Sequence, residues 1–211
     1  MNIFTIIFFI SFSFYTQAYA SHEKVKNIFV CAARDQILKT TSYNPAYQKI
    51  TYPNGDVNIQ EGVCTDVIVR TFRKAFGIDL QTLIHVDKKN NWKNYPNPWN
   101  SSRPDANIDH RRVPNLMHFF KTHGMQIKNK EYIPGDIIVW DLGSGILHIG
   151  ILSDSKTSLF QTLLNSGSGT PLVVHNISCG VQEEDILDHY KIIAHYRINE
   201  QIIKELKKLE K

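Results

Sequence analysis

The amino-acid sequence predicts an α+β domain in which N-terminal helices pack on one side of a C-terminal antiparallel sheet. Apolar residues recur with helical spacing in the first half of the 211-residue chain, whereas the second half carries short runs rich in β-branched residues. No linker separates the two halves, and helices followed by strands are typical of the α+β class. A composition that is 42% hydrophobic and 21% charged provides enough apolar material for one core.

The first 20 residues predict a secretory signal peptide. An apolar run from Ile3 to Tyr15 is followed by Ala18-Tyr19-Ala20, the small-x-small pattern of a cleavage site. The run is shorter than the roughly 20 residues that a helix needs to span a bilayer. We therefore expect an exported protein, periplasmic or secreted, whose mature domain covers residues 21–211 and which has no stable membrane insertion after cleavage.

The order of the predicted elements follows from periodicity and from stop signals. Helices are predicted at residues 23–39, within 62–77, at 78–89, and at 113–124, where proline lies near the start and glycine past the end. A turn is predicted at 53–56 and a polar loop with three prolines at 91–112. Strands are predicted at 135–142, 147–154, 171–177 and 191–198, and a surface helix is predicted in the tail at 199–211.

Cys64 stands at the N-terminal turn of the helix predicted within residues 62–77. At about 100° per residue, its side of this helix is largely apolar, so we expect the thiol to face the interior. Gly77 supplies the stop signal. Unpaired backbone N–H groups point out of a helix start and favour a thiolate, and the sequence therefore predicts an activated cysteine.

His148 is the matching candidate on the strand predicted at residues 147–154. Alternation places His148, Gly150 and Leu152 on one face of that strand, and Gly150 leaves space for a thiol to approach the imidazole. The next strand carries His175 and Asn176 side by side, either of which could orient the imidazole. Only one of these two can share the face of His148, and the sequence does not say which.

The order of these motifs resembles a known group of enzymes. GVCTDV opening a helix, then PGDIIVWDL, LHIGILSD and VVHNI, is similar to the papain-like cell-wall cysteine peptidases of the NlpC type. The chain is more closely similar to a family of exported bacterial proteins catalogued as a domain of unknown function and placed in the same broad group. That closer resemblance rests on YPNGD, GVCTDV, RPDANIDHRRVPNL, PGDIIVWDL and VVHNI, which span about residues 43–197.

The resemblance implies a papain-like fold of the NlpC type with Cys64 as nucleophile, His148 as base and His175 as orienter, with Asn176 as the alternative orienter. It implies a cysteine-dependent amide hydrolase, an endopeptidase or amidase, that acts on peptidoglycan or its peptide fragments without a cofactor. The sequence departs from the NlpC pattern where Thr65-Asp66 replaces Ser-Gly after the cysteine. The region 78–112 is also longer than in compact NlpC domains.

Substrate-binding candidates lie mostly in the loop at 91–112. Aromatic side chains there could stack on a sugar or line a groove, and an arginine could bind a stem-peptide carboxylate through two hydrogen bonds. The candidates are Asp66, Trp99, Arg103, Asp109, His110 and Arg111, with Trp92, Tyr95 and Arg112 as neighbours of the same kinds.

Two other classes of function stay open: a catalytically silent cell-wall-binding module, and a metal-binding periplasmic protein. The sequence contains no HExxH or CxxC motif, so no metal site is predicted. A net charge of +4 from scattered Lys and Arg residues gives no reason to expect nucleic-acid binding. We expect a monomer in which Cys31 and Cys179 are either paired with each other or buried, since connectivity cannot be read from sequence.

Overall fold

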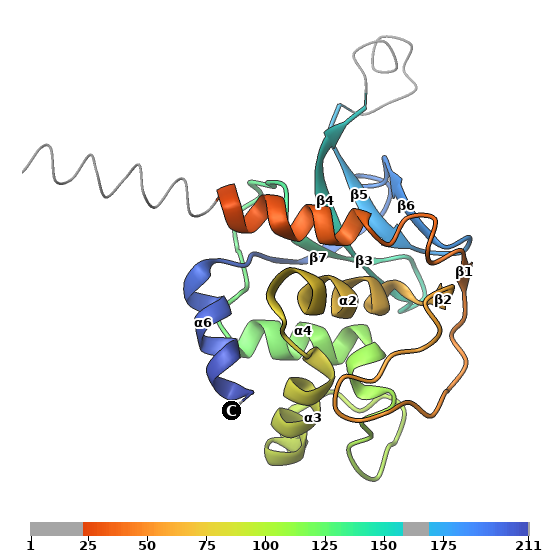
Figure 1. Cartoon of the computed structure of the whole chain (residues 1–211), viewed down its shortest axis with the longest axis vertical. Helices are drawn as coiled ribbons and strands as arrows, with labels where there is room; N and C mark the ends of the chain where they lie inside the picture. Colours follow the sequence, from red (N-terminus) through yellow and green to blue (C-terminus); the bar gives the residue numbers. More distant parts are fainter. Residues whose placement is uncertain (1–22, 158–168, 211) are drawn as a thin grey trace, which may run out of the picture.

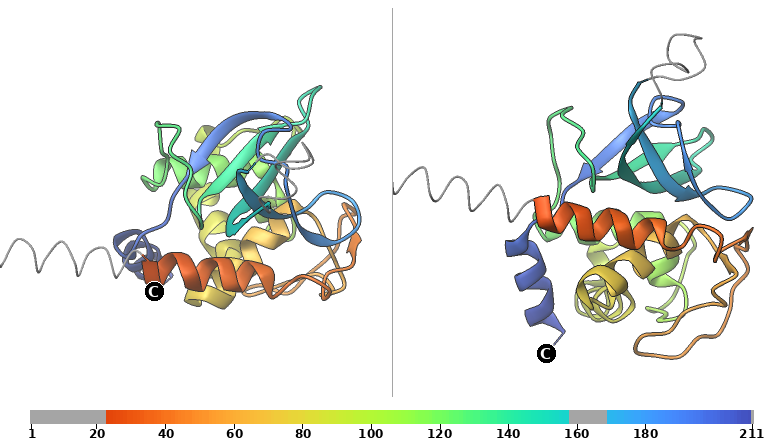
Figure 2. Two further views of the ribbon diagram at one scale, coloured as in Figure 1. Left: turned by 90° about the horizontal axis from the view of Figure 1, so that it is seen from above. Right: turned by 45° about the horizontal axis from the view of Figure 1, so that its top comes forward.

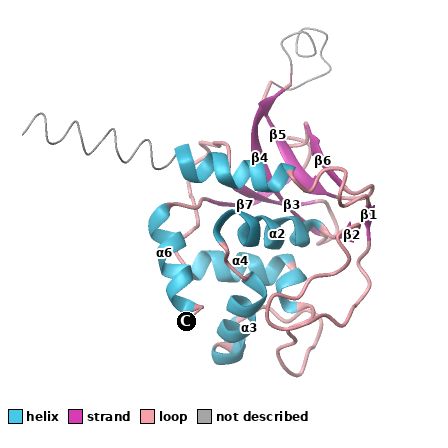
Figure 3. Cartoon of the chain, viewed as in Figure 1, coloured by secondary structure: helices cyan, strands magenta, loops and turns pink. Residues whose placement is uncertain are grey.

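The computed structural model describes residues 23–157 and 169–210, and the predicted signal peptide lies outside the described residues. The α+β architecture is confirmed, with helices on one side of an antiparallel sheet (Figure 1, Figure 3). Within the described residues, no helix is both long enough and apolar enough to cross a membrane.

The helices lie close to where the sequence predicts them. The N-terminal helix covers residues 23–34 and gives way to turns at 35–39. The other helices are α2 (Cys64–Phe76), α3 (Leu80–Asn90), α4 (Val113–Thr122) and α6 (Glu200–Leu209), with 3₁₀ turns at Trp92–Asn94 and Asp109–Arg111. The tail helix α6 is only partly a surface helix, because Ile202 and Leu206 are buried in the core.

Helix α2 begins and ends through local contacts. The backbone N–H of Val63, just before the helix, donates to Asp66 Oδ2 at 2.7 Å, which occupies a donor that the helix leaves free. At the other end Gly77 adopts φ 68°, a left-handed conformation that glycine tolerates without a steric penalty. These two contacts place Cys64 in the first turn.

Five strands form the main sheet in the order β6-β5-β4-β3-β7, all antiparallel. They are β3 (Ile137–Asp141), β4 (Leu147–Lys156), β5 (Pro171–Asn176), β6 (Val181–Glu184) and β7 (Lys191–Tyr196). A two-residue parallel pair, β1 (Ser42–Tyr43) and β2 (Glu61–Gly62), lies just before α2. The sequence does not predict β1, β2 or β6, because each is too short or too polar to give a period-two apolar pattern.

The sheet separates two apolar clusters. Ile149 and Ile151 of β4 pack with the helices, whereas Leu152 of the same strand packs with Ile138 and Trp140 on the opposite face. The alternation predicted for β4 is therefore confirmed. The right view of Figure 2 shows the strands on one side of the N-terminal helix and the other helices beneath it, and α2 contacts both β4 and β5.

Candidate active site at the start of helix α2

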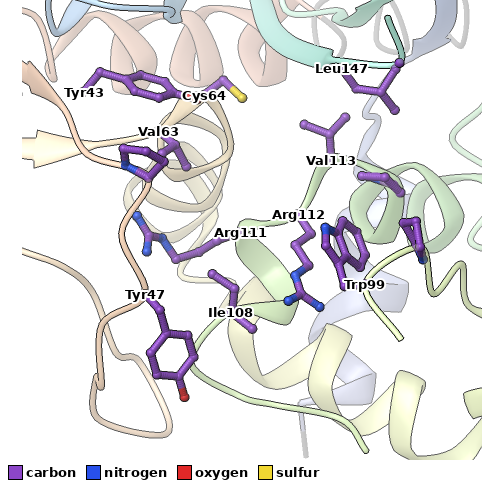
Figure 4. Close-up of a pocket in the computed structure, with 14 residues that line it drawn as sticks. Tyr43, Tyr47, Val63, Cys64, Trp99, Ile108, Arg111, Arg112, Val113 and Leu147 are labelled. Carbon is purple, nitrogen blue, oxygen red and sulfur yellow. The ribbon is translucent and has the colours of Figure 1, made fainter. Parts of the chain in front are cut away.

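Cys64 is the first residue of α2, is only 5% exposed, and lines a cavity of about 590 Å³. In Figure 4 its sulfur points toward the open centre of this cavity. Backbone N–H groups of Ile149, Thr65 and Cys64 itself lie close enough to the sulfur to lower the pKa of the thiol. The helix start and the beginning of β4 therefore converge on one atom.

The protonation state of Cys64 differs from the sequence prediction. Burial raises the pKa of the thiol to about 12, and the nearby Asp66 carboxylate acts in the same direction. The three backbone N–H groups lower the pKa but do not outweigh burial. The resting residue is therefore a thiol, and the predicted thiolate is wrong for this state because desolvation exceeds the effect of the helix start.

His148 on β4 and His175 on β5 form a buried pair. His148 Nε2 lies 3.0 Å from His175 Nδ1, and the two side chains are 2% and 1% exposed. Burial lowers the pKa of His148 to about 3, with a smaller contribution from His175, so its imidazole is neutral near pH 7. The structure thus brings together the two histidines that the sequence singles out.

Asn176, the alternative orienter, points away from His148. Its side-chain Nδ2 donates to the carbonyl of Gly62 at 3.0 Å and to that of Ser42 at 3.3 Å. These bonds attach β1 and β2 to the sheet immediately before Cys64. The choice that the sequence leaves open therefore falls on His175 for contact with His148.

No hydrogen bond joins the side chains of Cys64 and His148 in the described structure. The backbone N–H of Ile149, the residue next to His148, lowers the pKa of the thiol. The His148 ring lies on the sheet face of Trp140, with 5.9 Å between ring centroids, whereas Ile149 faces the helices. Alternation along β4 thus separates the imidazole from the helix-facing side, and the thiol reaches the strand backbone first.

Two of the predicted substrate-binding residues, Asp66 and Arg111, bind each other. Arg111 Nε and Nη2 donate to the two Asp66 carboxylate oxygens, both at 2.9 Å, and both side chains are almost fully buried. Arg111 also donates to the carbonyls of Asn44 and Ala46 at 3.4 Å. Arg111 lines the cavity, but its guanidinium is occupied in holding the segment around residues 44–46 against the start of α2.

Three other candidates do not line the cavity. Asp109 is buried and bonded to Lys88 at 2.7 Å, and His110 is buried, which lowers its pKa to about 4. Arg103 is exposed and lies outside the cavity lining. The loop at 91–112 therefore contributes to the cavity through residues other than these three.

Trp99 and Arg112 line the cavity, as do Pro98, Ile108 and Arg111 of the same loop. The Arg112 guanidinium carbon lies 4.0 Å from the centre of the Trp99 ring, a cation–π arrangement, and Nη1 donates to Ser101 Oγ at 3.3 Å. No acidic side chain is among the residues that line the cavity. The sequence also gives no signal for Tyr43, which lines the cavity and whose pKa burial raises to about 12.

The remaining cysteines and metal-ligating residues form no further site in the described chain. Cys31 and Cys179 are unpaired and exposed, so neither the predicted pairing nor the predicted burial holds. Among the described residues, no group of three or more His, Cys, Asp or Glu side chains is placed to hold a metal ion.

Comparisons with known proteins identify a family, a relative and similar solved structures. The family described as "Domain of unknown function (DUF1287)" matches residues 30–198. The Escherichia coli (strain K12) protein "Uncharacterized protein YijF" is 46% identical over 169 residues, which is 78% of each chain. "Structure of NlpC2 from Trichomonas vaginalis" aligns with a TM-score of 0.39 at 14% identity and covers 81% of this chain. The chain matches only 46% of that solved chain's length.

Proposed function

The chain belongs to the family described as Domain of unknown function (DUF1287), and from the geometry of its site we propose that it is a cysteine-dependent amide hydrolase of the papain-like NlpC type. One observation carries the proposal. A cysteine at a helix start opens into a cavity, and three backbone N–H groups lower the pKa of its thiol. One of these groups belongs to Ile149, the residue next to His148 of the buried histidine pair. A nucleophile, a base and donors for an oxyanion are the parts that acyl transfer needs.

The reaction follows from the neutral resting state. As the sulfur attacks the amide carbon, the Cys64 proton passes to His148, which then gives it to the leaving amine. The product is a thioester on Cys64. Water attacks that thioester, His148 takes a proton from the water, and the carboxylic acid leaves as the thiol is restored. The N–H groups of Cys64 and Ile149 would stabilise the negative oxygen in both steps.

This mechanism requires movement when substrate binds. His148 must approach the sulfur from the opposite face of β4, where its ring lies beside Trp140, and no hydrogen bond joins the two side chains in the described structure. A substrate carbonyl that takes the Ile149 N–H group would release the sulfur from that donor. Catalytic hydrogen bonds are often long or misaligned in a free enzyme and shorten only when the substrate is bound.

The cavity supports a substrate that carries a carboxylate. Arg112 lines the cavity, and among the described residues its one hydrogen bond is the long one to Ser101. Asp109 Oδ1 lies 3.8 Å from Arg112 Nη1, but that carboxylate is bonded more closely to Lys88, at 2.7 Å. Arg111, by contrast, is committed to Asp66. Guanidinium groups bind carboxylates through two parallel hydrogen bonds. Together with the predicted export, this favours the stem peptides of peptidoglycan as the substrate.

Digestion of isolated sacculi tests the proposal. The mature protein should release or shorten stem peptides that mass spectrometry detects, and chelator should leave this activity intact. Cys64→Ala should abolish the activity while the thermal unfolding transition remains, because the substitution removes the nucleophile and little volume. Cys31→Ala is the matched control, since Cys31 is exposed and does not line this cavity.

A catalytically silent wall-binding module is the second candidate, and one observation favours it: the resting thiol is protonated and not bonded to His148. The same digestion distinguishes the two functions. A silent module would sediment with sacculi yet release no peptides. If the protein neither sediments with sacculi nor releases peptides from them, both proposed functions at the cell wall are wrong.

A further inference from the structure

We infer that Glu184 is a positioning residue that fixes which ring nitrogens of His148 and His175 carry protons. This inference rests on the proposed function, in which His148 is the base. Glu184 lies on β6, an element that the sequence does not predict, and nothing in the sequence connects it to the site. Its role follows from the contacts of one carboxylate and two imidazoles.

The carboxylate reaches His175 across the sheet. Glu184 Oε2 lies 3.0 Å from His175 Nε2, and the described residues give Glu184 no other ion pair or hydrogen bond. The register of β5 and β6 explains the approach: His175 is opposite Gln182, so Glu184 is its diagonal neighbour on the same face. Diagonal pairs in a sheet are within reach of long side chains.

The adjacent glutamate points to the other face. Glu183 is bonded to Arg34 on the N-terminal helix and to Ser153 on β4, and in the described part of the chain no hydrogen bond or ion pair joins it to either histidine. Two carboxylates that are neighbours in sequence therefore serve different networks. Only Glu184 is placed to act on the histidine pair.

The proton arrangement then follows step by step. An ionised carboxylate only accepts hydrogen bonds, so the nitrogen facing it, His175 Nε2, must carry the proton. In neutral His175 the other nitrogen, Nδ1, is then an acceptor. His148 Nε2, 3.0 Å away, must donate to it. His148 is neutral, so its Nδ1 keeps a lone pair, which is what a base needs to take the thiol proton.

The carboxylate is close to His175 Nε2 but is not aligned as a hydrogen bond, and this buried nitrogen has no other partner. The Glu184 side chain is 41% exposed, whereas the His175 side chain is 1% exposed. The glutamate is thus the partner that can rotate into line. An unpaired buried N–H group is costly, which favours that rotation.

Nuclear magnetic resonance of the ring nitrogens tests this assignment directly, without substrate. In the full mature chain labelled with ¹⁵N on histidine, near pH 7, His148 should be protonated on Nε2 and not on Nδ1. Glu184→Ala should give a mixture of tautomers at both histidines. Glu184→Gln should retain the original tautomers, because the amide oxygen still accepts a hydrogen bond. Glu183→Gln is the matched control and should leave the ring-nitrogen signals unchanged.

Kinetics provide the second readout. Glu184→Ala should lower kcat on the order of tenfold, a modest share of the roughly 10²- to 10⁴-fold that a positioned base contributes, with KM little changed. Glu184→Gln should recover most of that loss. A wild-type His148 protonated on Nδ1, or a Glu184→Ala variant with unchanged tautomers, would overturn the inference. If the tautomers shift as expected but wild-type protein cleaves no amide, the inference about Glu184 stands and the proposed function fails.

Discussion

Two opposing effects act on the pKa of the Cys64 thiol, and only one of them can be predicted from the sequence. The helix start and the Ile149 N–H group stabilise a thiolate, but burial of the side chain raises the thiol pKa to about 12. Position on a helix can be read from periodicity, whereas the depth of burial depends on β4 and the loops that cover the site. The proposed mechanism therefore starts from a neutral thiol and a neutral imidazole, not from a preformed thiolate–imidazolium pair.

Alkylation rates test this view of the resting thiol. In a Cys31→Ser, Cys179→Ser double variant, Cys64 should react with iodoacetamide more slowly than an ordinary thiol of pKa about 8.5. The rate should still be rising at pH 10, because the reactive thiolate is scarce until the pH approaches the raised pKa. The pH dependence is measured by mass spectrometry of quenched samples.

The exposed thiols are the internal reference for that experiment. In the unmodified chain Cys31 and Cys179 should label first, since both are exposed and Cys64 is buried. A Cys64 rate that reaches its plateau below pH 7 would show a thiolate in the resting protein and would contradict the assigned protonation state.

At the scale of elements, helix α2 depends on a contact that no local pattern reveals. Its stripe of apolar residues and Gly77 predict the helix, but Asp66 is paired with Arg111, 45 residues away in the chain. From the sequence alone, both residues are predicted to bind substrate. In the structure they hold the segment around residues 44–46 on the helix start.

Replacing Arg111 should therefore affect stability first. Arg111→Ala leaves the buried Asp66 carboxylate without its cation, and breaking a buried ion pair in this way costs about 3–5 kcal/mol. The free energy of unfolding, measured with urea, should fall by that amount. Arg103→Ala, at an exposed position outside the cavity, should change it by less than about 0.5 kcal/mol. A similar small change for Arg111→Ala would show that the pair does not anchor α2.

The strands show why part of the site is predictable. Alternation along residues 147–154 and 171–177 is enough to predict that either His175 or Asn176 lies beside His148. In the structure, His175 is the residue that contacts His148. The position of Glu184 cannot be predicted in this way, because the short polar sequence of β6 has no apolar period that would fix its register in the sheet. Long-range pairing, not local propensity, brings this carboxylate to the histidines.

For the whole molecule, the predicted architecture is confirmed because the two periodicities lie in separate halves of the chain. The cavity is less predictable, since its lining combines the β1 segment, the start of α2, the long loop and the β3–β4 turn. The loop composition indicates aromatic and cationic side chains near a substrate. Only the fold shows that Trp99 and Arg112 face the cavity, whereas Asp109 and His110 lie beneath the surface.

Buried histidines make the stability of the whole molecule sensitive to acid. Burial lowers the pKa of His148 to about 3 and of His110 to about 4, and it also lowers the pKa of His175 despite the opposing effect of Glu184. Between about pH 6.5 and these values the unfolded chain binds more protons than the folded chain. The free energy of unfolding therefore falls as the pH falls below about 6.5.

At pH 5 His148 and His110 should each remove on the order of 2 kcal/mol of stability relative to pH 7.5. Urea unfolding at several pH values measures this loss. His148→Gln should reduce the slope of stability against pH, whereas His189→Gln, at an exposed position, should leave it unchanged. A free energy of unfolding that stays constant from pH 7.5 to pH 5 would show that these histidines are not held neutral.

The most direct test of the central claim is to trap the covalent intermediate. Mature protein mixed with a stem peptide and quenched in acid within its first turnovers should carry the acyl part of the peptide as a thioester on Cys64. Peptide mapping by mass spectrometry should locate the added mass at Cys64, with Cys31 and Cys179 unmodified, and hydroxylamine should remove it. Cleavage of the same peptide by Cys64→Ala protein at the wild-type rate, with no adduct on the wild-type cysteine, would contradict the account.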